Sequence, residues 1–64
     1  MDKRLKIGSR WVNASNKKHE IVCLANKKSV LPLTVIFEDS DHEQVFALQS
    51  EDFLYSMKLD IDNG

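Results

Sequence analysis

The 64-residue chain contains one cysteine, one proline and two glycines, and it has no long apolar run. A single cysteine, Cys23, excludes an internal disulfide framework and a multi-cysteine metal site. The longest stretch without charge, residues 29–37, is interrupted by Pro32 and is far shorter than the ~20 apolar residues of a membrane span. Two glycines do not make a phosphate-binding glycine-rich loop. These shortages predict a small domain outside the membrane with no cofactor.

A chain of this length forms one domain, and nearly all its large apolar residues are needed for the core because small domains bury little surface. Hydrophobic residues make up 42% and charged residues 30%, which argues against wholesale disorder. We expect a single domain over 1–64, with an ordered core at about 6–61 and a loose tail at 62–64. The N-terminus lacks the apolar segment of a secretory signal, so a cytoplasmic location is expected.

Alternating apolar residues between clusters of turn formers predict five strands and one helical turn. The strands are expected at residues 10–13, 20–25, 34–38, 44–49 and 57–61, and the helical turn at 50–56. The second strand is apolar on both faces, so we expect it at the centre of the sheet with Cys23 buried. Ser50 is expected to cap the helical turn through its hydroxyl.

Five short strands with a helical turn before the last predict an all-β fold, a small five-stranded SH3-like barrel, because closure removes exposed sheet edges. The runs "KIGSRWV", "VIFED" and "EDFLYSMKL" resemble the small SH3-like proteins often encoded by bacteriophages and prophages. The resemblance covers about residues 6–59. It implies the fold and an accessory protein in a bacterial host cell, but most members have no assigned activity and no catalytic residue is carried over.

Charge divides the chain into two halves of opposite sign. Residues 1–32 carry a net charge of +6, and residues 33–64 carry –7. The basic half could clamp phosphates through Arg10, Lys17, Lys18, Lys27 and Lys28, which would make nucleic acid a partner. In an up-and-down meander, however, each lysine pair would lie near an acidic segment, and this favours mixed-sign ends over one basic face. The same division permits a homodimer.

Two aromatic residues are candidates for a contact surface. Trp11 is either a core residue or an interface residue, since tryptophan suits both. Tyr55 is expected beside a surface groove, with its ring packed and its hydroxyl in water. The three phenylalanines fall at apolar positions that the core requires, which leaves no aromatic residues among the lysines to stack on bases.

The residues that could carry chemistry form no recognisable catalytic set. The acidic segment 38–43, which contains Asp41 and Glu43, lacks the glycine and the spacing of a calcium loop, so we interpret it as a turn or as a surface for a basic partner. His19 and His42 are expected at loop edges without a nucleophile or a second ligand nearby. No enzyme, metal or cofactor is predicted.

The leading hypothesis is a non-enzymatic protein-binding module, a phage or prophage accessory protein that engages or inhibits a host protein through mixed-charge loops and an exposed strand edge. The alternative is a small nucleic-acid-binding protein that uses the basic N-terminal half. The candidate contact residues are Arg10, Trp11, Lys17, Lys18, Lys27, Lys28, Asp41, Glu43 and Tyr55.

Overall fold

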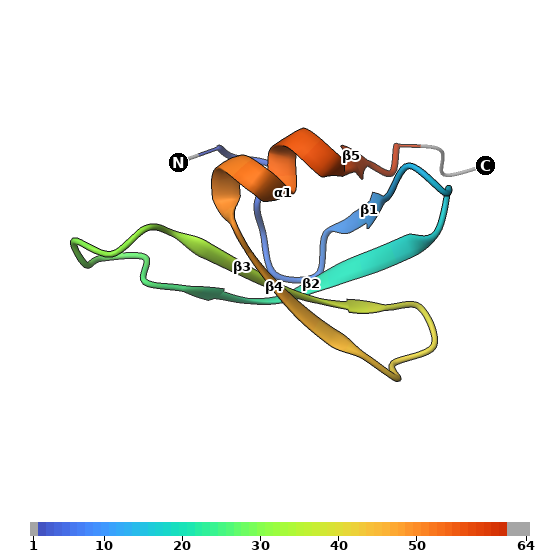
Figure 1. The fold of residues 1–64 in the computed structure, drawn as a ribbon, viewed down its shortest axis with the longest axis horizontal. Helices are drawn as coiled ribbons and strands as arrows, with labels where there is room; N and C mark the ends of the chain where they lie inside the picture. The colour runs from blue at the N-terminus through green and yellow to red at the C-terminus, as the bar shows by residue number, and fades with distance from the viewer. Residues whose placement is uncertain (1, 62–64) are drawn as a thin grey trace.

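A computed structural model of the chain describes residues 2–61, which form five strands and one helix. In chain order the elements are β1 (Arg10–Val12), β2 (Lys18–Ala25), β3 (Thr34–Asp39), β4 (Val45–Gln49), α1 (Ser50–Ser56) and β5 (Lys58–Leu59) (Figure 1). Each expected element is confirmed, with ends that differ by no more than two residues. The tail expected to be loose, 62–64, lies outside the described residues. Within 2–61 no helix has the length and apolar character needed to cross a bilayer.

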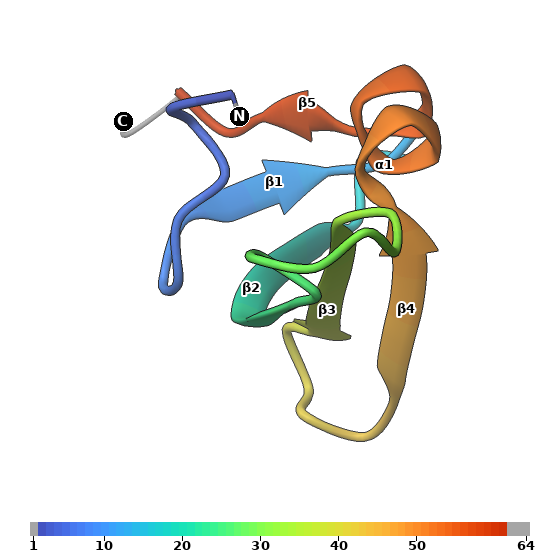
Figure 2. The ribbon, with the colours of Figure 1, turned by 90° about the vertical axis from the view of Figure 1, so that its left-hand side faces the viewer.

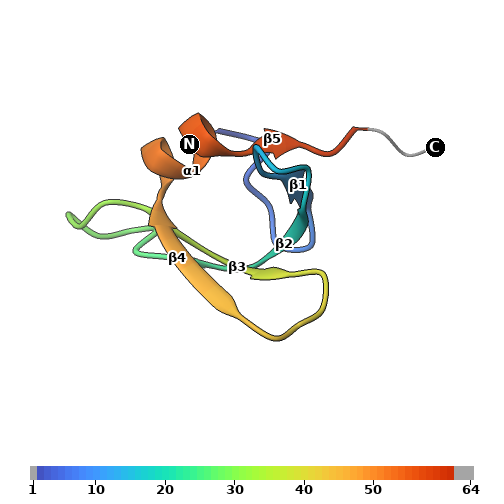
Figure 3. The same ribbon diagram turned by 45° about the vertical axis from the view of Figure 1, so that its right-hand side comes forward.

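The strands form one antiparallel sheet in the order β4-β3-β2-β1-β5 (Figure 2). β2 is the central strand, as expected from its apolar sequence. The sheet curls, and α1 lies between its two edge strands, β4 and β5 (Figure 3). No backbone ladder joins β4 to β5 within the described part of the chain, so the all-β prediction is confirmed as a small open sheet with one short helix.

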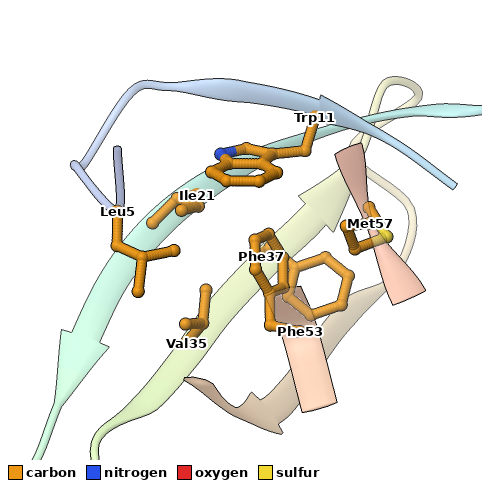
Figure 4. Packing of buried hydrophobic residues seen from close by; sticks show 7 residues of the cluster. All are labelled: Leu5, Trp11, Ile21, Val35, Phe37, Phe53 and Met57. Atoms are coloured by element: carbon orange, nitrogen blue, oxygen red, sulfur yellow. The ribbon is translucent and has the colours of Figure 1, made fainter. Parts of the chain in front are cut away.

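The concave face of the sheet carries the core, which the α1 helix covers (Figure 4). Trp11 is 1% exposed and Phe53 is fully buried, and their rings pack edge to face with centroids 4.9 Å apart. Phe53 also contacts Phe37, with centroids 5.0 Å apart. The predicted alternation in β3 is confirmed, since Val35 and Phe37 are buried in this core. Leu5 is buried as well, so the core begins one residue before the expected boundary.

A β-bulge in β2 reverses the expected face of Cys23. The register pairs Ile21 with Phe37 and then Cys23 with Ile36, so Val22 is an extra residue in the ladder. Strict alternation from Ile21 would place Cys23 in the core, but the extra residue turns Leu24 inward instead. Cys23 is exposed on the outer face, and the prediction that it is buried was wrong.

Two further details of the C-terminal elements differ from expectation. Gln49, in extended conformation, occupies the N-cap of α1, and no side-chain bond caps the helix, so Ser50 does not have the capping role predicted for it. Met57 is buried beneath the sheet but Ile61 is 77% exposed, because β5 ends at Leu59 and alternation stops there.

Candidate functional site

Two adjoining hollows form a groove between the β1–β2 loop and the end of α1, and we call it the Tyr55 groove. Residues that line both hollows are Asn13, Ala14 and Ser56. The first hollow is also lined by Val12, Asn16, Tyr55 and Lys58. The second is also lined by Ser15, His19, Phe37, Phe46 and Met57. The groove therefore runs from an exposed aromatic ring on the helix to an aromatic floor at the edge of the core.

The loop that forms one wall of the groove is held by Asn13. Its side-chain oxygen accepts hydrogen bonds from the backbone N–H groups of Ser15 and Lys17, both at 2.9 Å. Asn16 follows with a φ of 65°, a left-handed conformation that asparagine tolerates better than most residues. Because these bonds lie within the loop, the wall is formed before any partner arrives.

The helix places Tyr55 on the opposite wall. Phe53 and Met57 are four residues apart, so they lie on one side of α1, and both are buried. That side is filled by packing against the core, and Tyr55 projects from the other side with 93% of its surface exposed. The prediction that Tyr55 is a surface residue is confirmed. Its ring, which we expected to pack, is free.

Three aromatic rings form the floor of the groove. His19 packs edge to face on Phe37 and Phe46, with ring centroids 5.5 and 5.7 Å away. Its Nδ1 lies 3.1 Å from the carbonyl oxygen of Lys17, which can only accept, so this nitrogen donates. His19 is only 6% exposed within β2, and the prediction of a loop-edge position was wrong. Phe46, expected in the core, keeps 36% of its surface exposed.

Asp39 is a buried carboxylate at the end of β3 that ties the loops together. Its Oδ1 accepts the backbone N–H of Glu43 at 3.0 Å, and Lys17 Nζ lies 3.9 Å from Oδ2. Burial alone would raise the pKa of Asp39, but hydrogen bonds from the Glu43 and Gln44 backbone, with the charge of Lys17, lower it below its ordinary value. The side chain is therefore a charged anchor beneath the acidic loop.

A third hollow, of about 250 Å³, lies at the same end of the sheet and has a mixed charge. It is lined by Arg10, Lys18, His19, Glu20, Asp39, Ser40 and His42. His42 donates from Nδ1 to Glu38 Oε1 over 2.7 Å, and this bond raises the pKa of His42 above its ordinary value. Basic and acidic side chains line the same small hollow, so it does not favour either a purely anionic or a purely cationic ligand.

The predicted contact residues separate into groups. Lys17 and Lys18 lie beside carboxylates of Asp39 and Asp60, at 3.9 and 3.7 Å, and Arg10 lies 3.8 Å from Glu20. The backbone N–H of Ser40 also donates to the carbonyl of Lys18. The expectation that a lysine pair lies near an acidic segment at one end of the sheet is confirmed for Lys17 and Lys18.

The other candidate residues lie in loops outside the groove or are buried, with the exception of Tyr55. Lys27 and Lys28 are exposed in the β2–β3 loop, which projects from the body of the molecule (Figure 1). Asp41 and Glu43 are exposed in the β3–β4 loop. Trp11 is buried and its Nε1 donates to Ser9 Oγ at 3.0 Å, so the core interpretation of Trp11 is confirmed and its inclusion among the contact residues was wrong. Of the nine candidates, Tyr55 alone lines the groove.

Sequence reasoning missed three residues of the groove. Asn13 was placed at the end of the first expected strand, although an asparagine side chain commonly bonds to the backbone two residues further on and so forms a turn. Nothing local distinguishes His19 and Phe46 from ordinary strand residues, because their roles depend on strand pairing. In 2–61 no three His, Cys, Asp or Glu side chains come together as a metal site.

The chain was compared with protein-family models, curated proteins and solved structures, and none of them matches it.

Proposed function

We propose that this protein is a non-enzymatic protein-binding module whose Tyr55 groove receives an aromatic or aliphatic side chain of its partner. The observation that carries the proposal is that Tyr55 is 93% exposed on a helix whose opposite side packs Phe53 into the core. Aromatic residues are enriched at the centres of protein interfaces, where they supply contact area at small entropic cost. The exposed Tyr55 ring supplies contact area, and the facing loop, which Asn13 already holds, has little conformational freedom to lose on binding.

The polar groups around the groove suit recognition better than catalysis. Asn13 and Ser56 offer hydrogen-bonding groups, and the buried His19 packs edge to face against two phenylalanines that stack on each other. The hydroxyl of Ser56 already donates to the Asp52 carbonyl at 2.8 Å, so it is not paired with a base as an activated nucleophile would be. The groove thus supplies shape and a few hydrogen bonds, which are the features of a binding site.

The finer structural assignment is an SH3-like barrel, and the biological one is a phage or prophage accessory protein that engages or inhibits a host protein in the bacterial cytoplasm. Support for the first is the meander order with a short helix before β5. Support for the second is the sequence resemblance over residues 6–59.

Nucleic acid is the second candidate partner, on the strength of the net +6 of residues 1–32. Three of the basic residues, Arg10, Lys17 and Lys18, lie within 4 Å of carboxylates, which weakens their attraction for phosphate. Lys27 and Lys28 remain at the projecting loop. Replacing this pair by glutamate should abolish binding of DNA or RNA and remove its salt dependence if this candidate is right.

The test is affinity capture from bacterial lysate at near-physiological salt, with and without nuclease. Three baits are compared, the unaltered chain, Tyr55→Ala and the control Ile7→Ala. Ile7 is 67% exposed and lines neither hollow of the groove, so its replacement removes a similar exposed apolar side chain elsewhere. We expect a stoichiometric protein that survives nuclease, is kept by Ile7→Ala and is reduced about ten-fold or more by Tyr55→Ala.

Two results would contradict the proposal. Loss of all bound protein on nuclease treatment would favour nucleic acid. Equal capture of the partner by Tyr55→Ala and by the unaltered chain would mean that the groove does not bind the partner.

A further inference from the structure

The outer edge of β4 has backbone groups with no partner in the sheet. The backbone N–H of Asp39 donates to Gln44, and that of Ser50 donates to Leu33, at the two ends of the β3–β4 ladder. Antiparallel strands alternate residues that bond to the partner strand with residues that bond away from it. Even-numbered residues of β4 therefore bond to β3, and Val45 and Ala47 direct their N–H and C=O groups outward. Gln49 directs its N–H outward, but its C=O is the N-cap carbonyl at which the hydrogen bonds of α1 begin. Figure 2 shows no strand beyond this edge.

This edge lacks the features that protect exposed strands. Natural edge strands are shortened, bulged, or interrupted by lysine and proline. The opposite edge, β5, follows that rule with two residues, one of them Lys58. β4 has five residues, "VFALQ", without charge, proline or bulge. The unprotected edge is the one suited to receive another strand.

Both ends of this edge are acidic. Asp41 and Glu43 precede β4, and Glu51 and Asp52 follow it in the first turn of α1. All four residues are exposed. Within the described residues none of their carboxylates has a cation within 4.0 Å. The edge therefore offers an uncharged centre between two unpaired negative ends.

This charge pattern decides between two occupants. A second copy that paired its own β4 about Ala47 would place Glu43 of one chain beside Glu51 of the other, and a parallel arrangement would place Glu43 beside Glu43. Like charges at both ends oppose either pairing. A strand with basic ends is complementary instead, and complementarity of charge favours the correct partner and register.

We propose that β4 binds an extended segment of a partner protein by strand addition, and that this segment has an uncharged middle of about five residues with Lys or Arg at both ends. Val45 and Ala47 supply N–H and C=O groups for the backbone hydrogen bonds, and Gln49 supplies its N–H. Phe46, which faces the Tyr55 groove on the inner side, contacts alternate side chains of the added strand. The inference rests on the proposed protein-binding function but assigns a different surface to it.

The probe is a nine-residue synthetic peptide with two lysines at each end and alternating valine and threonine between them. Its control has glutamates in place of the lysines. Titration of isotope-labelled protein, followed by amide NMR shifts, should show the largest changes at residues 45, 47 and 49. We expect binding of the lysine peptide to exceed that of the glutamate peptide by about ten-fold or more at low salt, and to weaken as salt is added.

Two kinds of variant test the mechanism. Ala47→Pro removes an outward N–H without removing a bond to β3, and edge positions of this type accept proline. It should reduce affinity about ten-fold. A second test does not depend on proline being tolerated in the strand. The double variant Glu43→Gln, Glu51→Gln should weaken binding about three-fold, whereas Glu20→Gln should leave binding unchanged. Glu20 carries the same charge but lies on β2, separated from the edge by β3.

The outcomes separate this inference from the proposed function. Shifts confined to Tyr55 and the β1–β2 loop would overturn strand addition and leave the groove as a binding site. Equal affinity for both peptides, or no shift at β4, would overturn the inference. Concentration-dependent shifts at β4 without peptide would identify a second copy as the occupant and overturn it too. Edge shifts with the predicted charge preference, while Tyr55→Ala has no effect on lysate capture, would support the edge and contradict the groove.

Discussion

The two faces of the sheet are built from similar residues but differ in what covers them. In β3, Val35 is fully buried on the inner face, and its neighbour Ile36 is only half-buried on the outer face. Both are β-branched and suit a strand equally well. The inner face is covered by α1 and the N-terminal Leu5, whereas Ile36 lies in a row with Cys23 and Ala47, which are both exposed.

The outer face also depends on charge pairs more than on packing. Glu20 and Glu38 lie directly opposite each other on β2 and β3, and like charges in that position are destabilising. Arg10 lies 3.8 Å from Glu20, and His42 bonds to Glu38. The inner face is thus stabilised mainly by apolar burial, and the outer face carries charge pairs, of which the His42–Glu38 pair depends on pH.

The largest contrast is expected from placing a hydroxyl on each face in turn. Val35→Thr keeps the shape of the side chain but buries a hydroxyl among apolar groups, which should lower the free energy of unfolding by about 1–3 kcal/mol. Ile36→Thr exposes its hydroxyl to water and should cost less than about 1 kcal/mol. Urea unfolding followed by circular dichroism measures both. Equal costs would contradict the difference between the faces.

A smaller effect, visible through its pH dependence, is expected at His42. Its pKa in the folded chain is raised by the bond to Glu38, with Glu20 and Asp39 adding to it, above an ordinary value of about 6.5. The stabilisation is therefore full below the unfolded-state pKa and is lost as pH rises through the folded-state pKa. His42→Asn should lower the urea midpoint at pH 5.5 and have less effect at pH 8.5.

Asparagine is the matched replacement for His42 because it tolerates the φ of 60° at this position, so the substitution removes the charge without new backbone strain. An NMR titration of the His42 ring should show the raised pKa directly. A midpoint difference that is the same at both pH values would mean that the His42–Glu38 pair does not stabilise the fold.

The smallest effect on stability is expected at Cys23. Because the thiol is exposed on the outer face, a thiol reagent should label the native protein at a rate within about ten-fold of that for the unfolded chain. Cys23→Ser should change stability by less than about 0.5 kcal/mol. If labelling requires denaturant, the bulge at Val22 is misplaced and Cys23 faces the core.

The local sequence pattern was sufficient to predict the strands, the helix and most of the core. Alternation in residues 33–37 identified the buried side of β3, and the turn formers between strands identified the meander. Both signals act over a few residues, so they can be interpreted without knowledge of distant contacts. The surface position of Tyr55 was predicted in the same way, since its place beside the expected helical turn is a local property of the sequence.

The faces of β2 and the floor of the groove could not be interpreted locally. A bulge depends on how two strands pair, and one extra residue moved Cys23 outward and Leu24 inward. His19 is buried because Phe37 and Phe46 reach it from two other strands. Trp11 is buried because Phe53, forty-two residues later in the chain, packs against its ring.

Sequence alone determined which segments become strands and where the acidic and basic residues fall along the chain. Tertiary structure alone decided which basic residues meet carboxylates, that the Tyr55 ring does not pack, and which sheet edge remains open. The physical reason is that propensity and alternation are properties of neighbouring residues, whereas burial, ion pairing and an unpaired edge depend on which segments the fold brings together.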